Sequence, residues 1–143
     1  MNADILNTYR YNDIKIGLSH SFERIITKDM ESSFREITGD QNPMHIDDEY
    51  AKEHSYSEHI MFGMLTASFY STLAGMYLPG KYSLIHSIDI KLTNPVYLND
   101  KLTISGIVKE KEDSLNLIIV KAIIKKQDGK TVSRANIKII CLE

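Results

Sequence analysis

An acid and a base lie five residues apart in this sequence, at Asp40 and His45. The intervening Asn42-Pro43 prevents one helix from carrying both side chains, because proline lacks an amide hydrogen and disfavours the helical conformation in the residue before it. The two side chains are therefore predicted on a tight loop, which Gly39 can open with a positive φ. A carboxylate and an imidazole presented to the same space are suited to proton transfer and to the activation of water.

The same loop has structural and metal-binding interpretations. Asp, Asn and Pro are ordinary turn formers, so an Asp/His pair in a turn can be purely structural. Residues 40–42 resemble the start of a calcium loop, but His45 stands where that loop needs glycine and no glutamate stands at its twelfth position. His45, Asp47 and Asp48 lack the spacing of a zinc-binding helix. No glycine-rich phosphate loop is present, so we expect neither a metal nor a nucleotide cofactor.

A helix is predicted before the loop. Thr27 can cap its N-terminus, and Met30, Phe34 and Ile37 repeat at the spacing of one apolar face. Gly39 then ends the helix and leads into the loop.

After the loop, Asp47 can cap a short helix that runs to about His54. A polar linker over residues 55–60 follows, and His54 and His59 are interpreted as surface residues.

Residues 59–80 contain no Asp, Glu, Lys or Arg, a length that could span a membrane. Scattered Ser, Thr, Tyr and Gly argue against a membrane span, as does the Pro79-Gly80 pair that closes the stretch. A helix that is apolar on nearly every side is also typical of a buried core helix. We therefore predict a buried helix over residues 62–78.

β-Branched and aromatic residues predict a strand before this helix, and alternating apolar residues predict strands after it. The stretch 115–125 is apolar on both faces, which predicts a central strand. The predicted strands cover residues 19–25, 82–92, 102–108, 115–125 and 131–142. The alternation in the second of them places His86 on an apolar face, which indicates a core or interface histidine. Asp128-Gly129 is a strong hairpin signal between the last two strands. A sheet with one apolar face must be covered, and the buried helix is available to cover it, so the fold class is α+β.

Residues 34–45, followed by Ala51, resemble the signature of the MaoC-like dehydratases, the R-specific enoyl-CoA hydratases. Met44 stands where the family usually has Leu, Ile or Val. The resemblance continues through residues 62–71 and 94–100. It implies a hot-dog fold, in which an antiparallel sheet of about five strands wraps around a long buried central helix. The length of 143 residues fits one such domain over 1–143, with 1–13 as an N-terminal segment.

The resemblance implies a hydratase or dehydratase that acts on an enoyl or (R)-3-hydroxyacyl thioester of coenzyme A or acyl carrier protein. Asp40 and His45 would hold the reacting water between them. Gly63 would bind the enolate oxygen through its backbone, at the helix start where free amides and the positive end of the dipole meet. A purely structural alternative is that Gly63 only permits close helix packing.

Four further residues are predicted to contact the substrate or brace the site: Asn42, Phe62, Met64 and Ser71. Asn42 can brace the loop through its side chain. Phe62 stands where the family usually carries a histidine, a departure that affects pocket shape and substrate choice. Ser71 matches a serine that faces the site in relatives, although a helical serine can equally bond back to the preceding turn.

The composition, with 43% apolar residues, 25% charged residues and a net charge of −2, is that of an ordinary globular protein and gives no reason to expect nucleic acid as a partner. A single cysteine, Cys141, excludes an internal disulfide and fits a reducing cytoplasm, and residues 1–13 contain no apolar run of a signal peptide. Exposed sheet edges predict a homodimer or a larger even oligomer. The alternatives are a hot-dog acyl-CoA thioesterase and a non-catalytic subunit that binds acyl thioesters.

Overall fold

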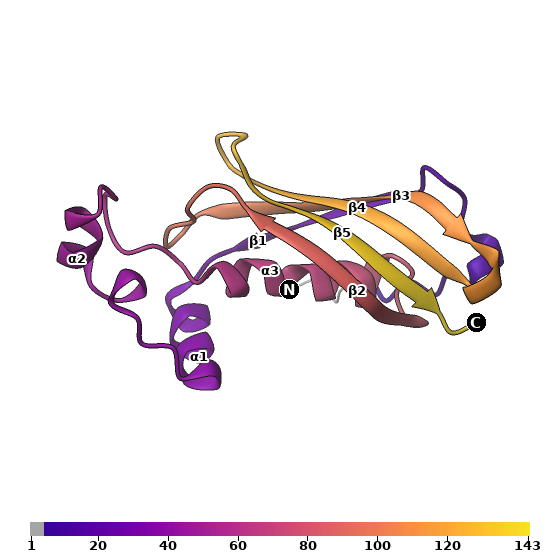
Figure 1. Cartoon of the computed structure of the whole chain (residues 1–143), viewed down its shortest axis with the longest axis horizontal. Coiled ribbons are helices and arrows are strands. Elements are labelled where there is room, and N and C mark those ends of the chain that lie inside the picture. The colour runs from indigo at the N-terminus through magenta and orange to yellow at the C-terminus, as the bar shows by residue number, and fades with distance from the viewer. Residues whose placement is uncertain (1–4) are drawn as a thin grey trace.

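A five-stranded antiparallel sheet forms the body of the computed structural model, which describes residues 5–143 (Figure 1). The strands are β1 (Ser19–Ile25), β2 (Ser83–Leu92), β3 (Lys101–Glu112), β4 (Leu117–Lys126) and β5 (Thr131–Cys141). They lie in the order β1-β3-β4-β5-β2, so β1 and β2 are the two edges. The predicted number of strands and their antiparallel pairing are confirmed. The first four residues of the predicted N-terminal segment lie outside the described residues.

One face of this sheet carries the core. β4 is the central strand, as its apolar sequence predicted, and its Val120 lies in register between Val108 of β3 and Ile137 of β5. All three side chains are fully buried, because residues that pair across a ladder share one face of the sheet. The hairpin between β4 and β5 turns at Asp128 and Gly129, where φ of the glycine is 84°, as predicted.

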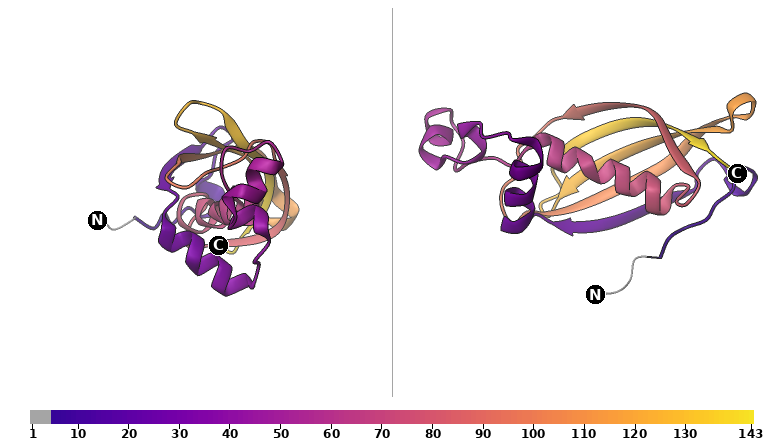
Figure 2. Two further views of the ribbon diagram at one scale, coloured as in Figure 1. Left: turned by 90° about the vertical axis from the view of Figure 1, so that its left-hand side faces the viewer. Right: turned by 90° about the horizontal axis from the view of Figure 1, so that it is seen from below.

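α3 (Gly63–Thr72) lies across the concave face of the sheet (Figures 1 and 2). It continues as one π-helical turn over residues 73–77, so the predicted central helix is confirmed. Tyr70 and Leu73 are fully buried against the sheet. The close approach of Leu73 depends on Gly106 of β3, because a methyl group on this glycine would lie 2.7 Å from Leu73 Cδ2.

The burial of α3 is one-sided. Met64, Ser68 and Ser71 lie on one stripe of the helix and are exposed, with Met64 62% accessible. The right-hand view of Figure 2 shows this outer side, which no other helix or strand within residues 5–143 covers. None of the helices in the described part of the chain is long and apolar enough to cross a membrane.

The predicted alternation of β2 is wrong in the first half of the strand. A bulge at His86 interrupts the pairing with β5 after Ile85. Leu84 is therefore 52% exposed whereas Ile85 packs against the core, and His86 itself is exposed, so it is not a core histidine. Beyond the bulge the predicted face is correct, but the edge position leaves Ile88 and Leu92 partly accessible, at 38% and 52%.

Two helices, α1 (Lys28–Thr38) and α2 (Asp48–Glu53), project beyond one end of the sheet (Figure 1). Both caps of α1 are as predicted: Thr27 Oγ1 accepts a hydrogen bond from the Met30 amide at 3.2 Å, and Gly39 ends the helix with φ 71°. The left-handed conformation at Gly39 turns the chain into the loop that carries Asp40 and His45.

The buried face of α1 differs from the prediction. Ile37, predicted on the apolar face, is 81% exposed, whereas the most buried residue of the helix is Glu31, at 1%. α2 begins as predicted at Asp47, whose Oδ1 accepts hydrogen bonds from the Glu49 and Tyr50 amides at 3.0 and 3.3 Å. The Asp40/His45 loop is thus fixed at both ends by a helix cap.

Candidate active site

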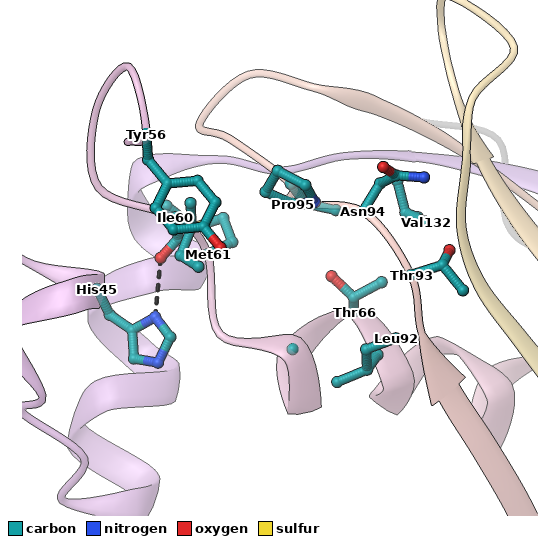
Figure 3. Close-up of a pocket in the computed structure, with 12 residues that line it drawn as sticks. His45, Tyr56, Ile60, Met61, Thr66, Leu92, Thr93, Asn94, Pro95 and Val132 are labelled. Carbon is teal, nitrogen blue, oxygen red and sulfur yellow. Dashed lines mark hydrogen bonds between the residues drawn. The ribbon is translucent and has the colours of Figure 1, made fainter. Parts of the chain in front are cut away.

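A cavity of about 270 Å³ opens between the motif loop (residues 39–47), the start of α3 and the connection from β2 to β3 (Figure 3). His45 and Gly63 lie in its wall, together with Tyr56 and Thr66. Most of the accessible lining is apolar, and a few polar groups converge on it, which is typical of a site for a small organic ligand.

His45 is held in one orientation. It ends a single 3-10 turn, η2 (Pro43–His45), which Asn42 opens by accepting a hydrogen bond from the Met44 amide at 3.0 Å. His45 Nδ1 lies 2.8 Å from the carbonyl oxygen of Ile60 (Figure 3). Because a carbonyl oxygen only accepts, Nδ1 carries a hydrogen, so in the neutral form of the ring the lone pair is on Nε2. Within the described residues Nε2 has no hydrogen-bond partner, so it is available as a base.

Phe62 supports the His45 ring and does not line the cavity. It is 2% exposed, its ring centroid lies 4.4 Å from that of His45, and on its other side it packs against Phe34 at 5.0 Å. The aromatic side chain at this position therefore acts on the orientation of the imidazole.

Asp40 lies on the exposed part of the motif loop. Its Oδ1 accepts a hydrogen bond from the Asn42 amide at 3.0 Å, and its own amide donates to Thr38 Oγ1 at 3.2 Å. These bonds fix the backbone of the loop and leave Oδ2 of Asp40 with no hydrogen-bond partner among the described residues.

Gly63 is the first residue of α3, and no side chain caps this end of the helix. The first amide hydrogens of a helix have no partner within the helix, and the positive end of its dipole lies there. A methyl group on Gly63 would collide with Leu92 Cδ1 of β2. Leu92 Cδ1 is the end of a flexible side chain that is 52% exposed and can move aside, so packing alone does not require glycine here. The missing side chain of Gly63 keeps the helix start open to the cavity.

The structure places the predicted site residues in two groups. His45 and Gly63 line the cavity. The others lie outside its lining within this single chain: Asp40, Asn42, Phe62, Met64 and Ser71. In the described part of the chain, no group of three or more His, Cys, Asp or Glu residues could hold a metal ion.

Residues 12–130 match the family model of the MaoC like domain. The chain belongs to this family. An (R)-specific enoyl-CoA hydratase of Rhodospirillum rubrum is 33% identical over 116 residues, which cover 78% of this chain and 81% of the relative. A 3-hydroxybutyryl-CoA dehydratase of Methylorubrum extorquens is 29% identical over 105 residues, covering 73% and 67%.

Solved structures agree with the family match. The unliganded R-hydratase PhaJ1 of Pseudomonas aeruginosa superposes with a TM-score of 0.88 at 27% identity, covering 97% of this chain and 88% of that one. This likeness confirms the predicted hot-dog fold. Since the named relatives are hydratases and dehydratases, this MaoC-like chain belongs to a family of hydro-lyases.

Sequence reasoning missed two polar residues of the MaoC-like cavity. Tyr56 was assigned to a polar linker, yet it lies in the wall opposite the start of α3 (Figure 3). Thr66 was counted only as part of a buried helix, yet the residue lines the cavity, and its buried hydroxyl has no hydrogen-bond partner in the described residues. A polar side chain inside an apolar helix, one turn after Gly63, was the available signal for Thr66.

Proposed function

We propose that this MaoC-like protein catalyses the reversible addition of water to an enoyl thioester of coenzyme A, with an (R)-3-hydroxyacyl thioester as the product. The observation that carries the proposal is the fixed His45 ring, which lines the same cavity as Gly63 and whose Nδ1 is bound to the Ile60 carbonyl, leaving Nε2 without a hydrogen-bond partner among the described residues. The similarity to a 3-hydroxybutyryl-CoA dehydratase and to an (R)-specific enoyl-CoA hydratase supports the reaction class, and the second of these relatives also supports the R configuration of the product.

In the proposed mechanism Asp40 and His45 share one water molecule. One of the pair takes a proton as the water oxygen bonds to the β-carbon, and a proton is delivered to the α-carbon from the same side. The net change forms one C–O bond and one C–H bond and breaks one O–H bond of water and the π bond of the carbon–carbon double bond, with no change of oxidation state overall. The side chains and the water supply the chemistry, without a resident metal or redox cofactor. The unpartnered Oδ2 of Asp40 and Nε2 of His45 support this assignment.

The free backbone amide of Gly63 is proposed to bind the thioester oxygen as it becomes an enolate. A good donor directed at such a charge contributes roughly 3–4 kcal/mol to the transition state. The acyl chain would then run along the apolar wall near α3. We assign supporting roles to the residues outside the lining: Asn42 braces the loop, Phe62 sets the His45 ring, and Met64 and Ser71 contact substrate from a second copy of the chain.

A homodimer or larger even oligomer is part of the proposal. The exposed stripe of α3 and the partly exposed apolar residues of the edge strand β2 are surfaces that a second copy can cover.

Thioesters of acyl carrier protein are a second class of substrate to be tested beside those of coenzyme A.

The deciding experiment is turnover of a panel of enoyl and 3-hydroxyacyl thioesters on coenzyme A and on acyl carrier protein. Loss of the conjugated enoyl absorbance and chiral analysis of the product would report hydration. Release of a free thiol would instead indicate a thioesterase, and tight binding without turnover would indicate a non-catalytic subunit. Either result would overturn the proposal.

A further inference from the structure

A cluster of charged side chains lies behind the candidate site, where α1, α2 and the segment before α3 meet. Its centre is Glu31 of α1, whose side chain is 1% exposed. The Glu31 carboxylate lies 2.8 Å from Arg35 Nη2, 3.5 Å from His59 Nε2 and 3.7 Å from Lys28 Nζ. The other ring nitrogen of His59, Nδ1, lies 2.5 Å from Asp48 Oδ1 of α2. His59, interpreted from the sequence as a surface residue, is only 14% exposed and joins two carboxylates.

The two ring nitrogens of His59 face two different carboxylates. Nδ1 forms a hydrogen bond with Asp48 Oδ1, whereas Nε2 lies 3.5 Å from Glu31 Oε2 without a hydrogen bond. On the other side of Glu31, Arg35 Nη2 donates a hydrogen bond to its Oε1 at 2.8 Å. Hydrogen bonds from the amide and ring of His59 also lower the pKa of the Asp48 carboxyl.

The cluster is demanding to maintain. Glu31 Oε2, Arg35 Nε and His59 Nε2 are buried and make no hydrogen bond within the described residues, so they depend on the ion pairs around them. Removing one member leaves a buried charge without compensation, which is far more costly than losing an exposed pair. Apolar residues could hold α1 in place without this risk.

His59 directly precedes Ile60, the residue whose carbonyl group orients His45. The His59 amide donates to Asp48 Oδ1 at 2.9 Å, and the Ile60 amide donates to the Met44 carbonyl at 3.0 Å. The Ile60 carbonyl follows these two anchors directly and precedes a third, the Met61 amide, which donates to the Val96 carbonyl at 2.7 Å. Held in this way, the carbonyl oxygen lies 2.8 Å from His45 Nδ1. A shift of His59 would thus move the acceptor that fixes the tautomer of His45.

The cluster also spans both ends of the motif loop. Glu31 belongs to α1, which leads into the loop, and Asp48 belongs to α2, which follows it. With one side chain bridging the two, the spacing of the helices and the position of the Ile60 carbonyl are set together.

We propose that His59, held between Glu31 and Asp48, is a positioning residue that fixes the orientation and tautomer of His45. The inference rests on the proposed function, in which His45 acts on the reacting water. It assigns a role in catalysis to a side chain that does not line the cavity.

The test compares His59→Gln with a matched control, His54→Gln. His54 is exposed, and its ring lies against Tyr50, with Nδ1 2.8 Å from the Tyr50 carbonyl oxygen. Among the described residues it forms no hydrogen bond or ion pair with the cluster. Two readouts are used on the full-length chain: steady-state kinetics on an enoyl-CoA substrate, and the nitrogen-15 chemical shifts of the His45 ring. We expect His59→Gln to lower kcat by about 10–100-fold with little change in KM, the size seen when a partner that orients an active-site ligand is removed. The Nε2-unprotonated signature of His45 should weaken in the same variant, and His54→Gln should match the wild type in both readouts.

Glu31→Gln is the second variant, in case His59→Gln does not fold. It should show the same change in the His45 shifts, and the double variant should be little worse than either single one, because both act through one contact. The proposal is overturned if the His45 shifts are unchanged in the folded variants, whatever happens to kcat, since the cluster would then be structural alone. If the wild type turns over no thioester, the proposed function fails, whereas the His45 shifts still decide whether His59 positions the ring.

Discussion

Asp40 and His45 differ in how firmly the fold holds them. His45 is fixed through Nδ1 by Ile60 and through its ring by Phe62, whereas Asp40 is held through one carboxylate oxygen on an exposed loop. In Asp40→Asn, the side-chain oxygen of the new asparagine can still accept the hydrogen bond from the Asn42 amide. The loop should therefore keep its shape in this variant.

Replacing the acid–base pair tests the mechanism at this scale. We expect Asp40→Asn to lower kcat by roughly 10²–10⁴-fold with a modest change in KM, because the lost interaction belongs to the transition state. His45→Gln should cause similar damage, and the double variant should be little worse than either single one, since both groups act on one water. Steady-state kinetics on a confirmed substrate would measure this. Near-native turnover by Asp40→Asn would refute the assignment, and so would unfolding of both single variants.

Thr66 gives a second prediction for single residues. Its hydroxyl is buried in the cavity wall without a partner in the described residues, so Thr66→Val should leave thermal stability unchanged or slightly raised. If the hydroxyl hydrogen-bonds the substrate, kcat/KM should fall by about 10-fold, the value of one ordinary hydrogen bond. Thr72→Val, on the same helix but outside the cavity lining, is the control. Equal kinetics for the two variants would exclude Thr66 from substrate binding.

At the scale of elements, the seating of α3 on the sheet depends on one small residue. Gly106→Ala would place a methyl group 2.7 Å from Leu73 Cδ2 and 3.0 Å from Val120 Cγ1, both inside the core. We expect a loss of about 1–3 kcal/mol in the free energy of unfolding, as for other overpacked cores. Gly75→Ala is the control, because its nearest neighbour would be 4.0 Å away. Denaturant unfolding of both variants measures the difference, and equal stabilities would contradict the packing argument.

The buried thiol of Cys141, at the end of β5, should make the stability of the protein depend on pH. Burial raises the pKa of the Cys141 thiol from 9.0 to about 11, so above pH 9 the unfolded chain ionises while the folded chain keeps its proton. The unfolded state then binds fewer protons, and the free energy of unfolding should fall by up to about 1.4 kcal/mol per pH unit between pH 9 and 11. Cys141→Ala lacks this group, so its stability should decline less steeply over the same range. Parallel declines in the two proteins would show that the thiol does not contribute.

Local sequence rules predicted the elements well where the cause was local. The caps at Thr27, Gly39 and Asp47 are contacts between near neighbours, and β5 alternates cleanly, with Ala135 and Ile137 buried. Their bounds could therefore be derived from the order of residues alone.

The errors arose where distant parts of the chain decide the outcome. The bulge at His86 reflects pairing with β5, and the burial of Glu31 reflects a histidine 28 positions later that the sequence placed on the surface. The motif had singled out His45 and Gly63, which line the cavity, whereas Thr66 could be placed there only once the fold brought its helix to the β2–β3 connection. The pattern of apolar residues within one segment does not show how that segment pairs with a distant strand or which distant side chains contact it.

At the scale of the whole molecule, one side of the fold exposes apolar residues. The outer stripe of α3, formed by Met64, Ser68 and Ser71, is exposed, and the neighbouring edge strand β2 carries partly exposed Ile88 and Leu92. Asp40 lies outside the cavity lining of a single chain, so a site completed by a second copy would reconcile its proposed role with its position.

Charge placed on each sheet edge tests this arrangement. If two copies join through β2, Ile88→Lys should shift the protein from dimer to monomer, because a charge would be buried at the new junction. Ile25→Lys makes the same change on the opposite edge strand β1, where the side chain is 52% exposed, and should leave the assembly intact. Light scattering at micromolar concentration measures the mass, and enoyl-CoA turnover should fall in step with dissociation if both copies complete the site. A wild-type protein that is a strict monomer and fully active would show that one chain suffices, and Asp40 would then have to reach the water by a movement of the motif loop alone.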